Sequence, residues 1–243
     1  MSHDNPVCKG CGFEIIPVMA DFDDPPPEYC YQCDPNYPRV KPADLERLVS
    51  VPAAYRKLVE LNIVPYFSAC GSVEFLNAEF IFDARQQSEI VERTLHLQPF
   101  AQTGSGDVWC WTAFRTGASG EPEVLLIDDS FKQVVVYAPN FQTFLYRSAL
   151  EDASGRREIA PDELPPKILG MAKILRQINA VKLADDLDAI GARPVKDYTP
   201  ERLRGQLRFL GLLSEEEVQE RIKRFLGPEF LQQEHGYDFL ARG

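Results

Sequence analysis

The sequence predicts an α+β fold, in which a strand-rich central region is followed by a helical C-terminal region. Strand character begins near Phe75 and lasts to about Tyr137, in short segments separated by Gly-, Pro- or Asp-containing breaks. Beyond residue 166 the apolar residues recur at three- and four-residue spacing, which is typical of amphipathic helices. Strands and helices that occupy separate stretches of one chain indicate the α+β class.

The chain divides into four parts on this pattern. We predict a cysteine-rich, ribbon-like segment at 1–43, an α+β domain at 44–152, a linker at 153–166 and a helical C-terminal extension at 167–243. Ser-Gly and Pro-Pro pairs mark the linker.

Composition is that of an ordinary globular protein, with 44% hydrophobic and 26% charged residues. No apolar run approaches the roughly 20 residues that span a bilayer. The first five residues lead into no basic segment followed by an apolar stretch, as a secretory signal would. We therefore expect a cytoplasmic protein without membrane contact, in which paired cysteines are more often metal ligands than disulfides.

Two Cys-x-x-Cys pairs, Cys8/Cys11 and Cys30/Cys33, are separated by 18 residues. This spacing is typical of two knuckles that close on one zinc ion, where four thiolates at about 2.3 Å complete a structural site. A redox dithiol is the alternative, but it would need one pair at the start of a helix after a buried strand. Both pairs lie among Gly, Pro, Asp and Tyr, so we predict a structural zinc.

Many zinc ribbons bind nucleic acid, which requires clustered positive charge. Residues 1–43 hold Lys9, Arg39 and Lys41 against seven carboxylates, several of them in the proline-broken loop 21–28. We therefore expect no nucleic-acid binding, and interpret the ribbon as a stabilising clip or a protein-docking surface.

Local patterns place the elements of the central region. Helices are expected from Pro42 and from Pro52, and Asn140 is a candidate N-cap for a helix that buries Phe141 and Phe144. Strands are predicted at 79–83, 93–97, 108–114, 124–127 and 133–137. The strand at 108–114 is apolar on both sides, which predicts a central strand covered on both faces.

The C-terminal extension shows helical periodicity and helix-end signals. A stripe of Ile168, Ala172, Leu175 and Ile178 predicts one buried helix face, and Thr199-Pro200 predicts the start of another helix. Ser214 with Glu217 forms a capping box, and Gly227-Pro228 closes the helix after it.

The stretch from Pro99 to Trp111 contains Gly104 and Gly106 but no phosphate-loop lysine, and a strand comes directly after Asp107. We interpret the stretch as a tight hairpin in which the glycines supply positive φ and Asp107 hydrogen-bonds the turn.

This hairpin, which consists of Pro-Phe-Ala, then Gly-x-Gly-Asp, then an aromatic strand, resembles the SUKH superfamily. Val51-Pro-x-x-Tyr55 through Asn62 resembles that family's opening helix. The segments 124–127 and 134–137 resemble its later strands, and 138–145 its closing helix. The match covers roughly 44–150, so the ribbon and the extension lie outside it.

The resemblance implies a bent, mostly antiparallel sheet and a binding role rather than catalysis. Bacterial members of the superfamily include immunity proteins that cap nuclease or deaminase toxins. Gly104, Gly106, Asp107 and Trp109 match the family motif, where such residues shape the fold.

Enzyme motifs are absent from the sequence, and we predict no catalytic residues. The histidines, His3, His96 and His235, form no paired motif, and the sequence shows no partner for Cys70 or Cys110. Asp128-Asp129 is interpreted as a solvated turn, and Asp185-Asp186 with Asp188 as a solvated helix face. An enzyme with a pocket built from distant residues stays as a third hypothesis.

Charge supports the first hypothesis, an immunity-type protein that neutralises a basic toxin domain. Residues 1–150 carry 11 Lys/Arg against 20 Asp/Glu, whereas residues 151–243 carry 15 against 17. An acidic surface attracts a basic partner, although acidity also serves solubility. The second hypothesis is a regulatory or scaffold protein that docks or self-associates through its extension; the oligomeric state stays open.

The zinc prediction has a direct test. Replacing Cys8 or Cys33 by serine removes one of four thiolates, so we expect the loss of about one equivalent of zinc without unfolding of the central sheet. Metal analysis of the purified variants measures this, and full zinc content in either variant would contradict the assignment.

Overall fold

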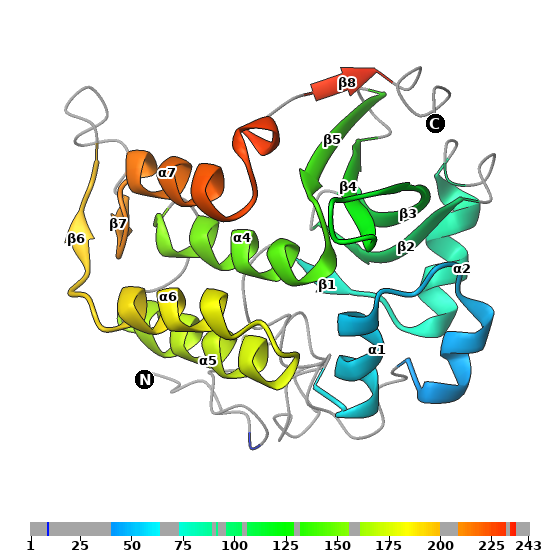
Figure 1. Ribbon diagram of the computed structural model, residues 1–243, viewed down its shortest axis with the longest axis horizontal. Helices are drawn as coiled ribbons and strands as arrows, with labels where there is room; N and C mark the ends of the chain where they lie inside the picture. The colour runs from blue at the N-terminus through cyan, green and yellow to red at the C-terminus, as the bar shows by residue number, and fades with distance from the viewer. Residues whose placement is uncertain are drawn as a thin grey trace, which may run out of the picture.

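A six-stranded antiparallel sheet and a group of helices make up the described part of the computed structural model (Figure 1). It describes residues 9, 40–63, 73–88, 91, 96–103, 106–128, 132–155, 161–199 and 209–231, with the backbone of 234–236. The sheet has the order β1 (Glu74–Phe75), β2 (Leu97–Gln102), β3 (Val108–Thr116), β4 (Pro122–Asp128), β5 (Gln133–Ala138) and β8 (Glu234–Gly236). The predicted α+β class is confirmed.

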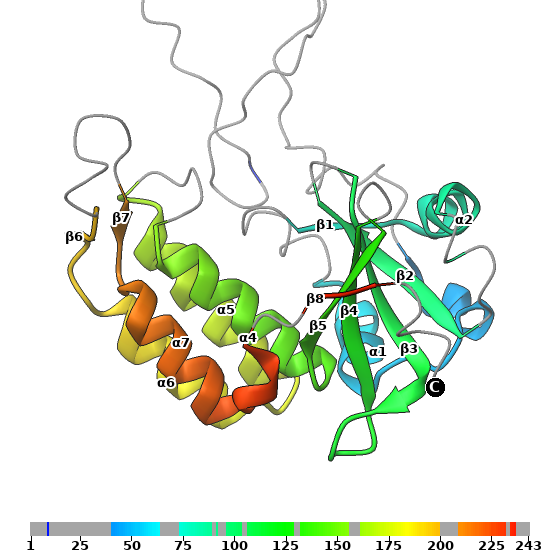
Figure 2. The ribbon, with the colours of Figure 1, turned by 90° about the horizontal axis from the view of Figure 1, so that it is seen from above.

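Helices come both before and after the main strands of this sheet in the chain. The N-terminal ones are η1 (Pro42–Arg47), α1 (Ala53–Glu60) and α2 (Ala78–Gln87). The later ones are α4 (Phe141–Ala153), α5 (Leu164–Gln177), α6 (Val181–Gly191), α7 (Glu215–Phe225) and η4 (Pro228–Phe230). β6 (Lys196–Asp197) and β7 (Leu210–Gly211) form a separate pair. Figure 2 shows α4 to α7 grouped on one side, with the sheet, α1 and α2 on the other.

Strand β3 lies inside the sheet, between β2 and β4. Trp109 and Trp111 point to one face, where Phe100 stacks on Trp111 with ring centroids 5.1 Å apart. Cys110 points to the other face and is fully buried. The prediction of a central strand covered on both faces is therefore confirmed.

Helix α4 begins where Asn140 predicted it. The Asn140 side chain accepts a hydrogen bond from the Thr143 amide at 2.9 Å, which satisfies one of the free amides of the first turn. Eleven of the thirteen residues of α4 are buried. A helix buried all round must pack on several elements, and α4 contacts the sheet as well as α5, α6 and α7.

Arg147 joins three parts of the chain inside this core. Its Nη1 donates to the carbonyls of Tyr137 and Phe230, at 2.8 Å each, and its Nε donates to Glu151 at 3.1 Å. The guanidinium also lies 4.0 Å from the centroid of the Tyr137 ring. The side chain is 4% exposed, so the charge depends on these partners for its stability.

The signals of the C-terminal helices are confirmed where the structure describes them. Ile168, Ala172, Leu175 and Ile178 are buried, and the Ser214–Glu217 capping box forms at the start of α7. Gly227 comes after the helix with φ +123°, a conformation that favours glycine, and its amide donates to the Ile222 carbonyl. The helix expected from Thr199-Pro200 falls on residues 200–208, which lie outside the described residues.

The end of α4 is joined to β7 by a close backbone crossing. The Ala153 carbonyl accepts hydrogen bonds from the amides of Leu212 and Leu213 at 2.7 and 3.1 Å. A Cβ on Gly155, whose φ is +70°, would clash with the Leu210 carbonyl oxygen. Glycine at 155 therefore permits the contact that holds this part of the extension against α4.

One predicted strand, 79–83, is wrong: these residues lie in helix α2. Asn77 caps the helix by accepting from the Phe80 amide at 2.9 Å, and Ile81 and Ala84 face the core at helical spacing. The apolar run Phe80-Ile81-Phe82 is short enough to fit a buried strand or a helix equally well, so its pattern does not separate the two.

Two further boundaries differ from the prediction. α5 begins at Leu164, inside the segment expected as a linker, because Pro165 and Pro166 fit the first turn of a helix. The strand expected at 93–97 begins only at Leu97 and continues to Gln102, while 92–95 lie outside the described residues. None of the helices among the described residues is long and apolar enough to cross a membrane.

Replacing Arg147 by methionine should lower the free energy of unfolding by about 3 kcal/mol, because two buried carbonyls lose their donor and no new polar partner replaces it. Urea unfolding followed by circular dichroism measures the change. Arg176→Met, at an exposed arginine that pairs with Asp185 and Asp188, is the matched control and should have a far smaller effect. Equal stability of wild type and Arg147→Met would contradict the role assigned to this side chain.

Candidate functional site

The predicted zinc ligands Cys8, Cys11, Cys30 and Cys33 lie outside the described residues, so the zinc site stays a prediction. Within the described ranges no group of three or more His, Cys, Asp or Glu residues could hold a metal ion.

The hairpin with the family-like motif has a structural role. Residues 102 and 108 pair across it, and Gly106 adopts φ +95°. The Asp107 amide donates to the Thr103 hydroxyl at 3.1 Å, and the Thr103 amide donates to the Asp107 carbonyl at 2.9 Å. Trp109 packs against Phe144 at 5.2 Å between ring centroids. The tight turn is confirmed; Gly104 lies outside the described residues.

Other candidate residues are dispersed. His96 precedes β2 with its ring 6.0 Å from that of Phe114, Cys110 is buried in the sheet, and Asp128 ends β4. For residue 235 the backbone alone is described, in β8, and His3, Cys70 and Asp129 lie outside the described residues. The structure therefore does not bring the described members of this group together.

The interpretation of the aspartates on α6 is wrong for one of them. Asp186 is 16% exposed and accepts hydrogen bonds from the Tyr146 hydroxyl at 2.7 Å and from Arg221 Nε at 3.0 Å. It joins α6 to α4 and α7. Asp185 and Asp188 face solvent, as predicted, and pair with Arg176 at 2.7 and 2.5 Å. No local pattern indicates that a tyrosine and an arginine from two other helices converge on the middle aspartate.

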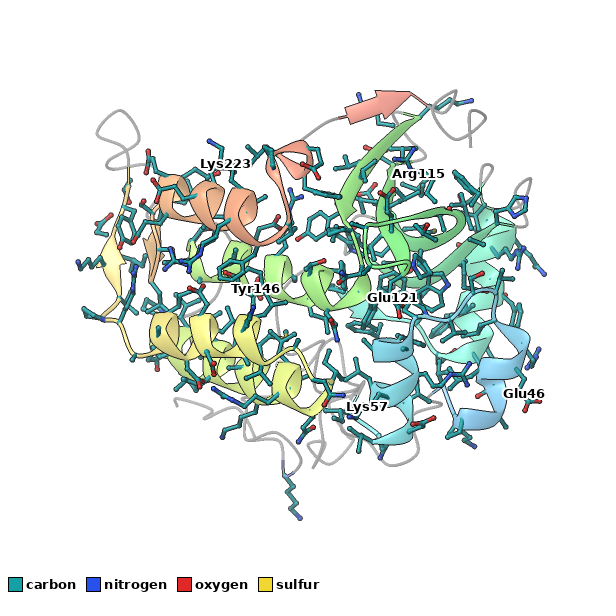
Figure 3. All side chains as sticks on the ribbon, in the orientation of Figure 1. Glu46, Lys57, Arg115, Glu121, Tyr146 and Lys223 are labelled. Carbon is teal, nitrogen blue, oxygen red and sulfur yellow. The ribbon has the colours of Figure 1, made fainter. Side chains whose placement is uncertain are left out.

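The first surface of interest is formed by η1 and α2, and we call it the η1–α2 face. Phe80 is 48% exposed at the start of α2, next to the exposed carboxylates Glu79 and Asp83. Arg47 of η1 lies with its guanidinium carbon 4.5 Å from the centroid of the Phe82 ring, which brings η1 against α2. Glu46, labelled in Figure 3, is exposed on η1.

The η1–α2 face thus combines an exposed aromatic ring with carboxylates on a helix. Glu79 and Asp83 are four residues apart and lie on one side of α2. The predicted strand at 79–83 did not indicate this face, because in a strand Phe80 would point to the side opposite Glu79 and Asp83. Asn77 as an N-cap was the signal that could have revealed it.

The second surface is a groove of about 660 Å³ between α1 and the turn that joins β3 to β4, which we call the α1 groove. Its floor is the outer side of α1, with Arg56, Lys57 and Glu60, and its wall is formed by 116 and 120–122. Apolar atoms come from Val51, Leu61 and Pro122 among others. Figure 3 shows Lys57 and Glu121 beside α1, on the same part of the molecule.

Glu121 closes one end of the α1 groove. Its Oε2 accepts a hydrogen bond from the Ala53 amide at 3.4 Å, at the first residue of α1. A carboxylate in this place interacts favourably with the positive end of the helix dipole. The turn that presents Glu121 is held by the Gly117 amide, which donates to the Glu121 carbonyl at 2.9 Å.

Comparisons of the chain with protein-family models, with curated proteins and with solved structures find no match.

Tyr146 makes a prediction about alkaline pH. Burial, and then the hydrogen bond to Asp186 and its negative charge, raise the pKa of Tyr146 above the ordinary tyrosine value of about 10. The folded state therefore holds this proton more tightly than the unfolded state does. Its contribution to stability is complete below the unfolded pKa and is lost as the pH rises from there towards the folded pKa.

We expect the free energy of unfolding, measured in urea, to fall between about pH 9 and about pH 11, and to fall less steeply in Tyr146→Phe. The variant also loses a hydrogen bond and should be less stable at about pH 9 by about 1 kcal/mol. An identical slope for the two proteins would show that Tyr146 ionises alike in both states.

Proposed function

We propose that the protein is a non-enzymatic protein-binding module of the immunity type, which neutralises a basic, nuclease- or deaminase-like toxin domain through the η1–α2 face. The observation that supports this most is Phe80, a large apolar side chain that is 48% exposed beside two carboxylates. Aromatic residues are enriched among the residues that dominate binding energy, and a rim of charge gives specificity and speed of association.

The neighbouring contact of Arg47 illustrates the chemistry of this face. Its guanidinium lies over the Phe82 ring, and its Nη1 is 4.0 Å from an oxygen of Asp44. Phe80, with Glu79 and Asp83, offers a second ring flanked by carboxylates, where an arginine or lysine of a partner would bind in the same manner. Carboxylates placed this way would stand in for the phosphates that a basic toxin domain recognises.

Two further features support the proposal. The resemblance of roughly 44–150 to the SUKH superfamily implies a binding role, and the negative balance of residues 1–150 would steer a basic partner. The predicted zinc ribbon would act in this scheme as a stabilising clip for the N-terminal segment. Zinc would supply four metal–sulfur bonds and no chemistry beyond them.

A regulatory or scaffold protein that acts through its C-terminal extension is the second candidate. Val181, which is 52% exposed at the start of α6, favours it. However, the apolar stripes of α5, α6 and α7 are buried in a core shared with α4. Deletion of 167–243 would expose α4, so point variants on the surface separate the two candidates better than truncation.

The test is affinity capture of the tagged protein from its own source cells at low salt, repeated with Phe80→Ala and with Val181→Ala as the matched control. We expect a stoichiometric basic protein that wild type and Val181→Ala retain, and that Phe80→Ala binds with a Kd raised about tenfold or more. The purified partner should lose its nuclease or deaminase activity when the protein is added.

Salt provides a second readout with the purified pair. Affinity should fall between about 50 mM and about 300 mM salt, because exposed charges are screened over this range. A partner that binds Phe80→Ala as tightly as wild type but loses affinity for Val181→Ala would favour the scaffold. A partner whose affinity is insensitive to salt would refute the electrostatic part of the proposal.

A further inference from the structure

We propose that the α1 groove is a binding site for a peptide carboxylate flanked by apolar residues, with the carboxylate held between Arg56 and Lys57. This inference is independent of the proposed function, because the η1–α2 face selects a partner of the opposite charge. The volume of about 660 Å³ falls within the range of about 300–1,000 Å³ that is usual for ligand sites, so it accommodates a few residues of a peptide.

The two cations are the first part of the argument. Arg56 and Lys57 are adjacent residues on the side of α1 that forms the floor of the groove. Neither side chain forms a salt bridge with any other residue in the part of the chain that is described. The groove thus holds two uncompensated donors in a concave place.

The two carboxylates that line the groove, Glu60 and Glu121, form no ion pair with Arg56 or Lys57 in the described part of the chain. Glu121 is engaged with the Ala53 amide at the start of α1. Glu60 comes four residues after Arg56 on α1, but in the described part of the chain the two side chains are not close enough to form an ion pair. Glu121 lies at Ala53, the two cations at 56 and 57, and Glu60 at the other end. An α-helix rises about 1.5 Å per residue, so the charges along the floor run negative, positive, negative over about 10 Å.

This order of charges selects the occupant. A peptide with one carboxylate opposite Arg56 and Lys57 gains two charge-assisted hydrogen bonds. A peptide with several successive acids would place further carboxylates opposite Glu121 and Glu60, which repel them. The apolar surface on both sides includes Leu61, which is 48% exposed and available to bury. The occupant is therefore a single carboxylate between apolar residues.

We assign the carboxylate to a glutamate side chain inside a peptide, because only an internal residue has apolar neighbours on both sides, whereas a peptide C-terminus has none after it. Three probes test this assignment. These are acetyl-Leu-Glu-Leu-amide, acetyl-Leu-Gln-Leu-amide and acetyl-Leu-Gln-Leu with a free carboxyl group. Binding to the full-length protein is followed by amide chemical shifts and by titration calorimetry. We expect the first probe to bind about tenfold or more tightly than the neutral second probe. Tighter binding of the third probe than of the first would overturn the assignment to an internal glutamate and identify a peptide C-terminus as the occupant.

Variants test the location and the sign of the charge. The double variant Arg56→Gln/Lys57→Gln should lose about tenfold or more in affinity, whereas Glu60→Gln should bind the acidic probe a few-fold more tightly because a repelling charge is gone. Lys182→Gln, at an exposed lysine on α6, is the matched control and should bind as wild type does. All of these positions are on the surface, and unchanged thermal unfolding verifies that the variants fold.

Equal binding of the neutral and the acidic probes would overturn the proposal, as would a double variant that binds like wild type. Weaker binding of the acidic probe in Glu60→Gln would also overturn it, because Glu60 would then help to hold the probe instead of repelling its carboxylate. None of these outcomes depends on Phe80, so they test the proposal for the α1 groove independently of the proposal for the η1–α2 face.

Discussion

The buried guanidinium of Arg147 is the constraint on which the arrangement of the chain depends. A buried charge is costly unless its donors are satisfied, and the partners of Arg147 come from β5, from α4 itself and from η4 near the C-terminus. The Phe230 carbonyl reaches it only if α7 and η4 pack on α4. The polypeptide then returns to the sheet, where residues 234–236 pair with β5 as its edge neighbour. The extension therefore completes the described core.

A second consequence concerns the surfaces that remain for binding. The sheet-facing side of α4 is occupied by the aromatic cluster, and its other sides by α5, α6 and α7. Phe80 and the α1 groove, on which the two proposals rest, come from η1, α1, α2 and the β3–β4 turn. Figures 1 and 3 place these elements on the opposite side of the molecule from α7. The helical group α4 to α7 contributes most of its apolar residues to the core, whereas both proposed surfaces lie on the elements before it and on the β3–β4 turn.

Sequence patterns predicted those parts of the fold that depend on local chemistry. Asn140 and Ser214 are caps whose geometry is set within three residues, and the stripe from Ile168 to Ile178 follows helix periodicity alone. The contacts that escaped prediction depend on residues far apart in the chain: Asp186 meets Tyr146 and Arg221 across two helix interfaces. The α1 groove likewise joins α1 to a turn some sixty residues later, and no periodicity encodes such a meeting.

Hydrogen bonds to the sheet hold part of both surfaces, which matters for binding. The connection between η1 and α1 is fixed to the sheet through one residue. The Val49 amide donates to the Gln98 side chain at 3.0 Å, and the Trp111 indole donates to the Val49 carbonyl at 2.6 Å. Gln98 and Trp111 are themselves buried and lie opposite each other on β2 and β3. A surface fixed in this way loses little conformational entropy when a partner binds, so even a few well-placed side chains contribute most of their interaction energy to affinity.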